Sequence, residues 1–321
     1  MSWIELSINT TNEAVDWVCT LLAKAITVED MQISKYQEES SQWTFTIQMY
    51  LLEDTRIHQR IDRIEKILTP LHRTGMTSEL QTFILKHNHD PITSTFQTAS
   101  SLIRKIGDRF VVLSVDSDYQ AHPQEIVMRL QNSLAFGSGL HPATILSLHL
   151  LERHVKPNLE TLDLGSGSGI LSVAMAKLGA KVLAIDNDPI AVAATQDAVE
   201  RNQVSQQVIV KEASLGSASQ LGHWMGGDSI ESVPAIADHA QFDLIVANIF
   251  ARVHISLASE FYKALRSTSN HSGILITAGY TSDRTENVSS AMLEAGFREC
   301  DRVQIDEWIA IAFVSAKTRK K

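Results

Sequence analysis

The chain has 321 residues, of which 44% are hydrophobic and 20% are charged, as in an ordinary soluble globular protein that is long enough for two domains. Its formal net charge of −9 argues against a broad nucleic-acid-binding face, and no apolar run reaches the roughly 20 residues that cross a bilayer. The two cysteines lie far apart, no metal-ligand spacing exists and no export signal is visible, so we expect a cytoplasmic protein with neither a metal site nor a membrane anchor.

The first part of the chain alternates short strand patterns with amphipathic helix patterns. One predicted helix runs through Val15, Val18, Leu22 and Ile26, and a second carries Ile57 to Leu68 on one face and ends before Pro70. Strands are predicted at 3–8, 31–36, 43–51 and 80–85. The resulting order βαββαβ predicts a small ferredoxin-like α+β domain over residues 1–90, which we interpret as a substrate-recognition module.

Residues 91–132 follow as a linker with the first elements of a second domain. Strand patterns occur at 109–115 and 125–130, and an exposed loop is expected at 116–123 between them.

Residues 133–321 have the pattern of one doubly wound α/β domain. Strands are predicted at 161–164, 182–185, 207–211, 242–247 and 273–278, and helices at 169–178, 190–202, 253–266 and 284–295. Two final strands, 297–303 and 308–314, form an antiparallel hairpin that closes the sheet. Residues 213–241 interrupt this rhythm and are rich in Ser, Gly and Asp. They are either a mobile loop near the ligand site or a surface insertion with no role.

The most informative segment is a glycine-rich turn after a short apolar strand. The strand Thr161–Leu164 leads into Gly165, Gly167 and Gly169, and an apolar helix pattern follows. The next strand ends at Asp186, about 20 residues past the turn, which is the distance one βαβ step needs to bring an acid beside a ribose. This arrangement predicts a nucleoside cofactor at the edge of a parallel sheet.

The spacing of the glycines discriminates between cofactors. The dinucleotide fingerprint Gly-x-Gly-x-x-Gly fails in both frames, because its third glycine would fall on Ile170 or Ser172. The observed pattern, Asp163-x-Gly165-x-Gly167-x-Gly169, is instead the spacing of S-adenosylmethionine enzymes. We therefore predict S-adenosyl-L-methionine as the cofactor, with Gly165 and Gly167 allowing its close approach to the backbone.

Four segments together resemble the ribosomal protein L11 methyltransferase family. They are the loop Leu134 to Thr144 (Leu-Ala-Phe-Gly-Ser-Gly-Leu-His-Pro-Ala-Thr), the turn 163–169, the strand end 185–189 (Ile-Asp-Asn-Asp-Pro) and the strand end 246–250 (Val-Ala-Asn-Ile-Phe). Glu307-Trp308 also matches. The resemblance covers about residues 130–314, while the first domain keeps only the order of elements. Ser138 and Ala143 replace threonines of the family loop, and Ser166 replaces the usual cysteine.

This resemblance implies a seven-stranded class I methyltransferase (Rossmann-like) domain and specific site residues. In the family the positions of Thr144, Gly165, Asp186 and Asn248 contact S-adenosylmethionine, Asp186 through the ribose. His141 either shapes the loop or makes a structural hydrogen bond. The family methylates lysine side chains and the α-amine of ribosomal protein L11. We expect the same N-methyltransferase activity here, from a monomer that needs no dedicated catalytic base and does not bind nucleic acid directly.

Other functions stay open at this point. The chain could be a class I methyltransferase for a small molecule or for a different protein, or a non-catalytic S-adenosylmethionine-binding protein. An RNA methyltransferase is disfavoured because residues 248–251 read Asn-Ile-Phe-Ala rather than Asn-Pro-Pro-Tyr, and because the chain is acidic. A dehydrogenase is disfavoured by the spacing of the glycines.

Overall fold

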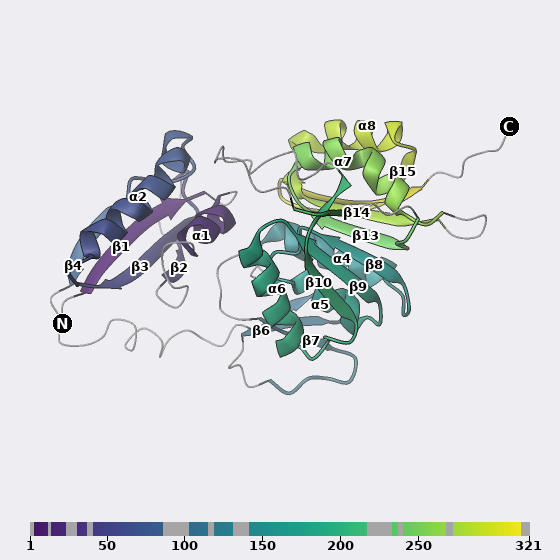
Figure 1. The fold of residues 1–321 in the computed structure, drawn as a ribbon, viewed down its shortest axis with the longest axis horizontal. Helices are drawn as coiled ribbons and strands as arrows, with labels where there is room; N and C mark the ends of the chain where they lie inside the picture. The colour runs from purple at the N-terminus through teal and green to yellow at the C-terminus, as the bar shows by residue number, and fades with distance from the viewer. Residues whose placement is uncertain are drawn as a thin grey trace. The chain divides into compact units, whose positions relative to one another are not determined.

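The chain forms two compact units in a computed structural model (Figure 1), one within residues 1–102 and the other within residues 103–131 and 139–321. The structure describes residues 3–11, 14–23, 31–36, 41–85, 103–114, 119–130, 141–216, 233–236, 240–267 and 272–315. None of the helices in these ranges is long and apolar enough to cross a membrane.

The first unit is a four-stranded antiparallel sheet with two helices. Its elements are β1 (Trp3–Thr10), α1 (Val15–Ala23), β2 (Met31–Lys35), β3 (Phe45–Leu52), α2 (Ile57–Arg73) and β4 (Gln81–Leu85). The strand order is β2-β3-β1-β4, so the predicted ferredoxin-like plan is confirmed. Along β1 the side chains of Ile4, Leu6 and Ile8 are buried and alternate with partly exposed positions, as expected for a strand with one face in a core.

The predicted end of the second helix is wrong, because α2 continues through Pro70 to Arg73. Pro70 lacks an N–H group, so it leaves one backbone carbonyl without a partner within the helix. The ring is exposed, and water can reach that side of the helix. Leu71, one residue later, is buried in the core and keeps the last turn in place. Burial of the apolar face therefore outweighs the local cost of the proline.

The second unit contains the seven-stranded sheet that the sequence predicts. Its strands are β8 (Glu160–Leu164), β9 (Lys181–Asp186), β10 (Val208–Glu212), β13 (Leu244–Asn248), β14 (Ile274–Thr281), β15 (Phe297–Ile305) and β16 (Trp308–Ser315). The order is β10-β9-β8-β13-β14-β16-β15. Strands β10 to β14 of this order are parallel, whereas β16 is antiparallel to β14 and β15 is antiparallel to β16. The closing hairpin is thus confirmed.

Helices cover both faces of this sheet (Figure 1). The helices α4 (Pro142–His154), α5 (Ile170–Lys177) and α6 (Pro189–Arg201) pack on one face, and α7 (Ala251–Ala264) and α8 (Thr285–Glu294) pack on the other. The strands are therefore buried on both sides, and this is why β13 reads as the continuous apolar run Leu-Ile-Val-Ala before Asn248. Chain order reverses between β8 and β13, and such a switch point is where open α/β sheets bind ligands.

A small three-stranded sheet precedes α4. It consists of β5 (Ile103–Ile106), β6 (Phe110–Ser114) and β7 (Ile126–Leu130), in the order β5-β6-β7. The sequence predicts β6 and β7 but misses β5, which is four residues long and carries two cations. Ile106 nevertheless packs into the same core as α4 and α5. Burial therefore stabilises this strand where the local sequence pattern is weak.

The segment 213–241 is described only at its base. There β11 (Ser214–Leu215) pairs in parallel with β12 (Ala235–Ile236), while residues 217–232 and 237–239 lie outside the described residues. A role for this segment stays a prediction.

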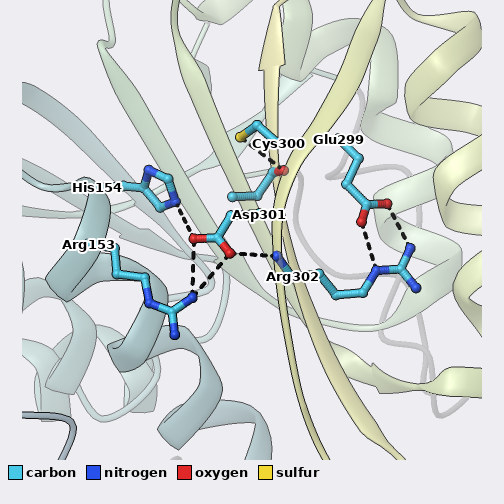
Figure 2. Close-up of polar contacts among 7 residues, drawn as sticks. Arg153, His154, Glu299, Cys300, Asp301 and Arg302 are labelled. Atoms are coloured by element: carbon cyan, nitrogen blue, oxygen red, sulfur yellow. Dashed lines mark hydrogen bonds and ion pairs between the residues drawn. The ribbon is translucent and has the colours of Figure 1, made fainter.

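The carboxyl end of α4 is tied to the edge strand β15 by a cluster of polar and charged side chains (Figure 2). Asp301 accepts a hydrogen bond from Arg153 Nη1 at 3.1 Å, and His154 Nε2 lies 3.0 Å from its Oδ2. Because Arg153 and His154 are the last residues of α4, this cluster fixes the helix whose other end carries Thr144.

Candidate functional site

The glycine-rich turn joins β8 to α5 at the carboxyl edge of the sheet. Gly165, Gly167 and Gly169 have φ values of 74°, 53° and 78°, so all three have the left-handed backbone that favours glycine. The amides of Gly165 and Ser166 both donate to the carbonyl of Ile185, at 2.9 and 3.1 Å. The turn is therefore pinned to the end of β9, beside Asp186.

Space as well as backbone angle requires glycine at two positions of the turn. A Cβ atom on Gly165 would lie 2.7 Å from Ile249 Cγ2, and one on Gly169 would lie 2.9 Å from Thr195 Cα. Both distances are shorter than real carbon–carbon contacts. Gly165 thus lets the turn touch the segment that follows β13, which brings the ends of β8 and β13 together.

Thr195 supports the turn from below, and sequence reasoning missed it. Its hydroxyl donates to the carbonyl of Gly167 at 3.0 Å, and the Ser166 hydroxyl lies 2.8 Å from Thr195 Oγ1. Since the single Thr195 proton is used on Gly167, Ser166 is the donor of the second bond. The signal was available, because Thr195 is the polar member of a buried stripe on α6 that also contains Ala191, Ala198 and Val199.

Asp186 ends β9 with backbone amides on both carboxylate oxygens. Gly167 N donates to Oδ2 and Asp188 N donates to Oδ1, each at 3.0 Å. A carboxylate offers about four lone-pair sites, so further hydrogen bonds can be accepted from two vicinal hydroxyls. The amide from Gly167 couples the position of the acid to the turn itself.

Asp163 is a second acid at this edge, and it was not among the predicted site residues. Its side chain is fully buried and faces α5, where Ser172 Oγ donates to Oδ2 at 2.6 Å. The other oxygen, Oδ1, is buried and has no hydrogen-bond partner among the described residues. Burial raises the pKa of Asp163 to about 7, and the nearby charge of Asp186 acts in the same direction. Burial also raises the pKa of Asp186.

Asn248 ends β13 and meets α4. Its Nδ2 donates to the Thr144 hydroxyl at 3.3 Å, so these two predicted residues are in contact. Thr144 is buried in the first turn of α4, whereas the helix is capped by His141, whose Nδ1 accepts from Ala143 N at 3.2 Å. His141 thus makes a structural hydrogen bond. Residues 134–140 of the same loop lie outside the described residues.

Gly279 on the neighbouring strand leaves the space that the Asn248 side chain occupies. It lies in a register shift of β14 with φ +89°, and a Cβ atom there would be 2.8 Å from Asn248 Oδ1 and 2.6 Å from Ile249 O. Gly279 is therefore a positioning residue for Asn248.

We expect Gly279→Ala to lower kcat/KM by about 100-fold, because a displacement of about 1 Å at a reacting site has that effect. Gly179→Ala is the matched control. Gly179 has φ +92°, and its added Cβ would meet only Pro157 at 3.2 Å, at the opposite edge of the sheet. Both variants should lower the unfolding midpoint, Gly279→Ala by more because its overlaps are shorter, but only Gly279→Ala should lose activity in the folded protein. Equal activities of the two variants would contradict this assignment.

The five predicted site residues thus fall into two contacting groups at one edge of the sheet. Gly165, Gly167 and Asp186 form the first, and Asn248 and Thr144 form the second. The contact between Gly165 and Ile249 joins the groups across the switch point between β8 and β13. In the described residues no cluster of His, Cys, Asp or Glu could hold a metal ion. The first group offers the carboxylate of Asp186, which can accept hydrogen bonds from hydroxyl groups, and the second offers the side-chain amide of Asn248. Such an arrangement is expected for an extended polar ligand.

Comparisons with known proteins place the whole chain beside one family. The family model for ribosomal protein L11 methyltransferase (PrmA) matches residues 2–316. Proteins named ribosomal protein L11 methyltransferase from Chloroflexus aurantiacus and Herpetosiphon aurantiacus are 36% and 34% identical to the chain, over 97% of it and over 97% and 98% of their own lengths. A crystal structure of ribosomal protein L11 methylase from Lactobacillus delbrueckii subsp. bulgaricus is similar with a TM-score of 0.54 and 25% identity, over 67% of this chain and 97% of that one.

Proposed function

Because the chain belongs to the ribosomal protein L11 methyltransferase family, we propose that it transfers methyl groups from S-adenosylmethionine to lysine side chains and the N-terminal amine of ribosomal protein L11. The observation that carries this proposal is the contact of two groups of residues at the switch point. The group with Gly165, Gly167 and Asp186 suits a nucleoside, and the group with Asn248 and Thr144 suits an amine.

The residues at the turn fit S-adenosylmethionine. Asp186 keeps acceptor capacity for the two ribose hydroxyls, and Gly165 leaves room for close approach to the backbone. The unpartnered Oδ1 of Asp163 requires a donor, and the ammonium group of the methionyl arm is one. S-adenosylmethionine supplies a methyl group that its sulfonium has already activated, so positioning carries most of the catalysis.

We propose that Thr144 and Asn248 contact S-adenosylmethionine, and that Asn248 also acts on the acceptor side. The Thr144 hydroxyl holds the Asn248 amide nitrogen, so Asn248 Oδ1 is oriented and can accept a hydrogen bond from the incoming amine. A lysine ammonium must lose a proton before its lone pair can attack. Loss of hydration in the site lowers the lysine pKa, and water can accept the proton. We therefore assign no side chain as a catalytic base.

The ferredoxin-like unit is proposed to bind the protein substrate. We assign residues 1–90 to recognition, 91–132 to the connection and the first elements of the catalytic domain, and 133–321 to methyl transfer. A protein substrate needs an additional binding surface, and a separate compact unit provides one without altering the cofactor site. We further propose that the protein acts as a monomer in the cytoplasm, without direct contact to nucleic acid.

Methyl transfer to purified L11 tests the proposal. With radiolabelled S-adenosylmethionine, the wild-type protein should label L11, and Asn248→Ala should lower kcat/KM by about 100-fold through lost orientation of the amine. Calorimetry with S-adenosylhomocysteine provides the control for cofactor binding. Unlabelled L11 together with intact cofactor binding would exclude L11 as the substrate and favour a small molecule or another protein. Absence of cofactor binding would reject the methyltransferase assignment itself.

A further inference from the structure

Trp308 carries a buried polar group that the proposed mechanism does not use. The side chain is 6% exposed, and its indole Nε1 is buried with no hydrogen-bond partner among the described residues. A buried N–H group without an acceptor destabilises a fold, so such groups are rare in native structures. An unpaired donor of this kind is a candidate for binding a ligand acceptor.

Trp308 lies at the same edge of the sheet as the candidate site. It begins β16, which runs antiparallel to β14, so the start of β16 lies beside the carboxyl end of β14, where Thr281 pairs with Trp308. The side chain belongs to the core on the α4 side of the sheet, and its ring contacts the His141 ring edge-on at a centroid distance of 4.3 Å. His141 caps α4 one turn from Thr144, which holds Asn248.

The strand order places Trp308 on the acceptor side of this edge. From Asp186 on β9 the order runs through β8 and β13 to β14 and β16, so Asn248 lies between Asp186 and Trp308. Neighbouring strands are about 4.8 Å apart, so four steps separate β9 from β16 by about 19 Å. The sulfonium is joined to the ribose by a single methylene group, so a ribose at Asp186 leaves the reacting end near β8 and β13. A group at β16 lies beyond it.

We propose that Trp308 forms the wall of the amine subsite and that its indole N–H donates a hydrogen bond to a backbone carbonyl of the polypeptide substrate, next to the amine that is methylated. This inference rests on the proposed function, since it requires a polypeptide acceptor. The indole N–H group is a donor only, so its partner must be an acceptor oxygen, and the amide carbonyls that flank a lysine or an N-terminal amine provide one. The single rigid bond would fix the approach of the amine toward Asn248.

The test removes the N–H group while the shape of the side chain is kept. Trp308 is replaced by 3-benzothienylalanine, in which sulfur takes the place of the N–H group, and by phenylalanine in Trp308→Phe. Tyr280→Phe is the matched control. Tyr280 pairs with Ile309 next to Trp308, is buried on the opposite face of the sheet, and its hydroxyl is already satisfied by Thr277 Oγ1 at 2.8 Å.

The measurements are the KM for L11, calorimetric binding of L11 to the S-adenosylhomocysteine complex, binding of S-adenosylhomocysteine alone, and the unfolding midpoint. Both Trp308 variants should raise KM and weaken L11 binding about tenfold, the effect of one buried hydrogen bond, with unchanged S-adenosylhomocysteine affinity. The benzothienyl variant should not unfold earlier than wild type, whereas Tyr280→Phe should unfold earlier and bind L11 normally.

Two results would overturn the inference: Trp308 variants with wild-type affinity for L11, or variants whose affinity for S-adenosylhomocysteine falls as much as that for L11. Failure of the proposed function is seen separately, because the wild-type protein would then leave L11 unlabelled.

Discussion

Replacement of Gly165 by alanine is expected to weaken binding of S-adenosylhomocysteine by at least about 30-fold. Two costs combine at this position. A left-handed residue with a Cβ atom costs about 1–2 kcal/mol, and overlap with a packed neighbour costs a further 1–3 kcal/mol, while each 1.4 kcal/mol is a factor of ten in affinity. The overlap is with Ile249 Cγ2 at 2.7 Å, a methyl group attached to a branched carbon that cannot swing aside. The turn must therefore move away from Asn248 or distort.

Gly75→Ala is a control that carries the backbone cost alone, outside the cofactor site. Gly75 has the same φ of +74°, but a Cβ atom there would have no other atom within 4 Å. It should lose stability in its own unit and keep full cofactor affinity. The double variant Gly165→Ala/Ile249→Ala removes the overlapping methyl group and should recover part of the affinity. Calorimetry with S-adenosylhomocysteine measures all three, and wild-type affinity of Gly165→Ala would show that the turn does not contact the ligand.

The parts of the site that follow chain order could be predicted from the sequence. The turn, Asp186 and Asn248 all end or follow strands of a parallel sheet, and parallel strands bring their carboxyl ends to one edge. The pattern of strands therefore places these residues together before any coordinates are known. The hairpin of β15 and β16 was predictable for a similar reason, because a tight polar turn between two strands dictates antiparallel pairing.

The parts that depend on packing between distant segments could not be predicted. The sequence shows Thr195 as a polar member of an apolar stripe and Asp163 as part of the glycine pattern. It does not show that α6 brings Thr195 to the turn or that Ser172 of α5 lies opposite Asp163. The helix α2 continues past Pro70 because the next residue, Leu71, is buried in the core. In each case tertiary contacts outweigh a local preference, which a sequence window does not contain.

The pH dependence of stability should change strongly in Asp163→Asn. Burial raises the pKa of Asp163 from an ordinary 3.8 to about 7, so the folded protein keeps a proton that the unfolded chain releases above pH 4. The free energy of unfolding of the wild type should therefore fall by about 1.4 kcal/mol for each pH unit between about pH 4 and about pH 7. Above about pH 7 it should stay at this lower value. Asparagine keeps the shape but cannot ionise, so the variant should be more stable than wild type at pH 8, by up to about 4 kcal/mol.

The same variant should bind S-adenosylhomocysteine about 10-fold to 100-fold more weakly at pH 8, because an ionised acceptor is replaced by a neutral amide. Asp243→Asn is the control. Asp243 is also buried, but its oxygens are paired with Arg266 Nη1 at 2.8 Å and the amide of Glu160 at 3.0 Å, so its loss should destabilise the protein at pH 8 and leave cofactor affinity intact. The unfolding transition of the cofactor-binding unit is identified in the wild type as the one that S-adenosylhomocysteine shifts. The midpoint of this transition is then measured from pH 5 to pH 8. A wild-type pH slope in Asp163→Asn would show that the acid stays ionised in the fold. Gained stability with lost affinity would instead show that this buried carboxylate is retained for the ligand at the expense of the fold.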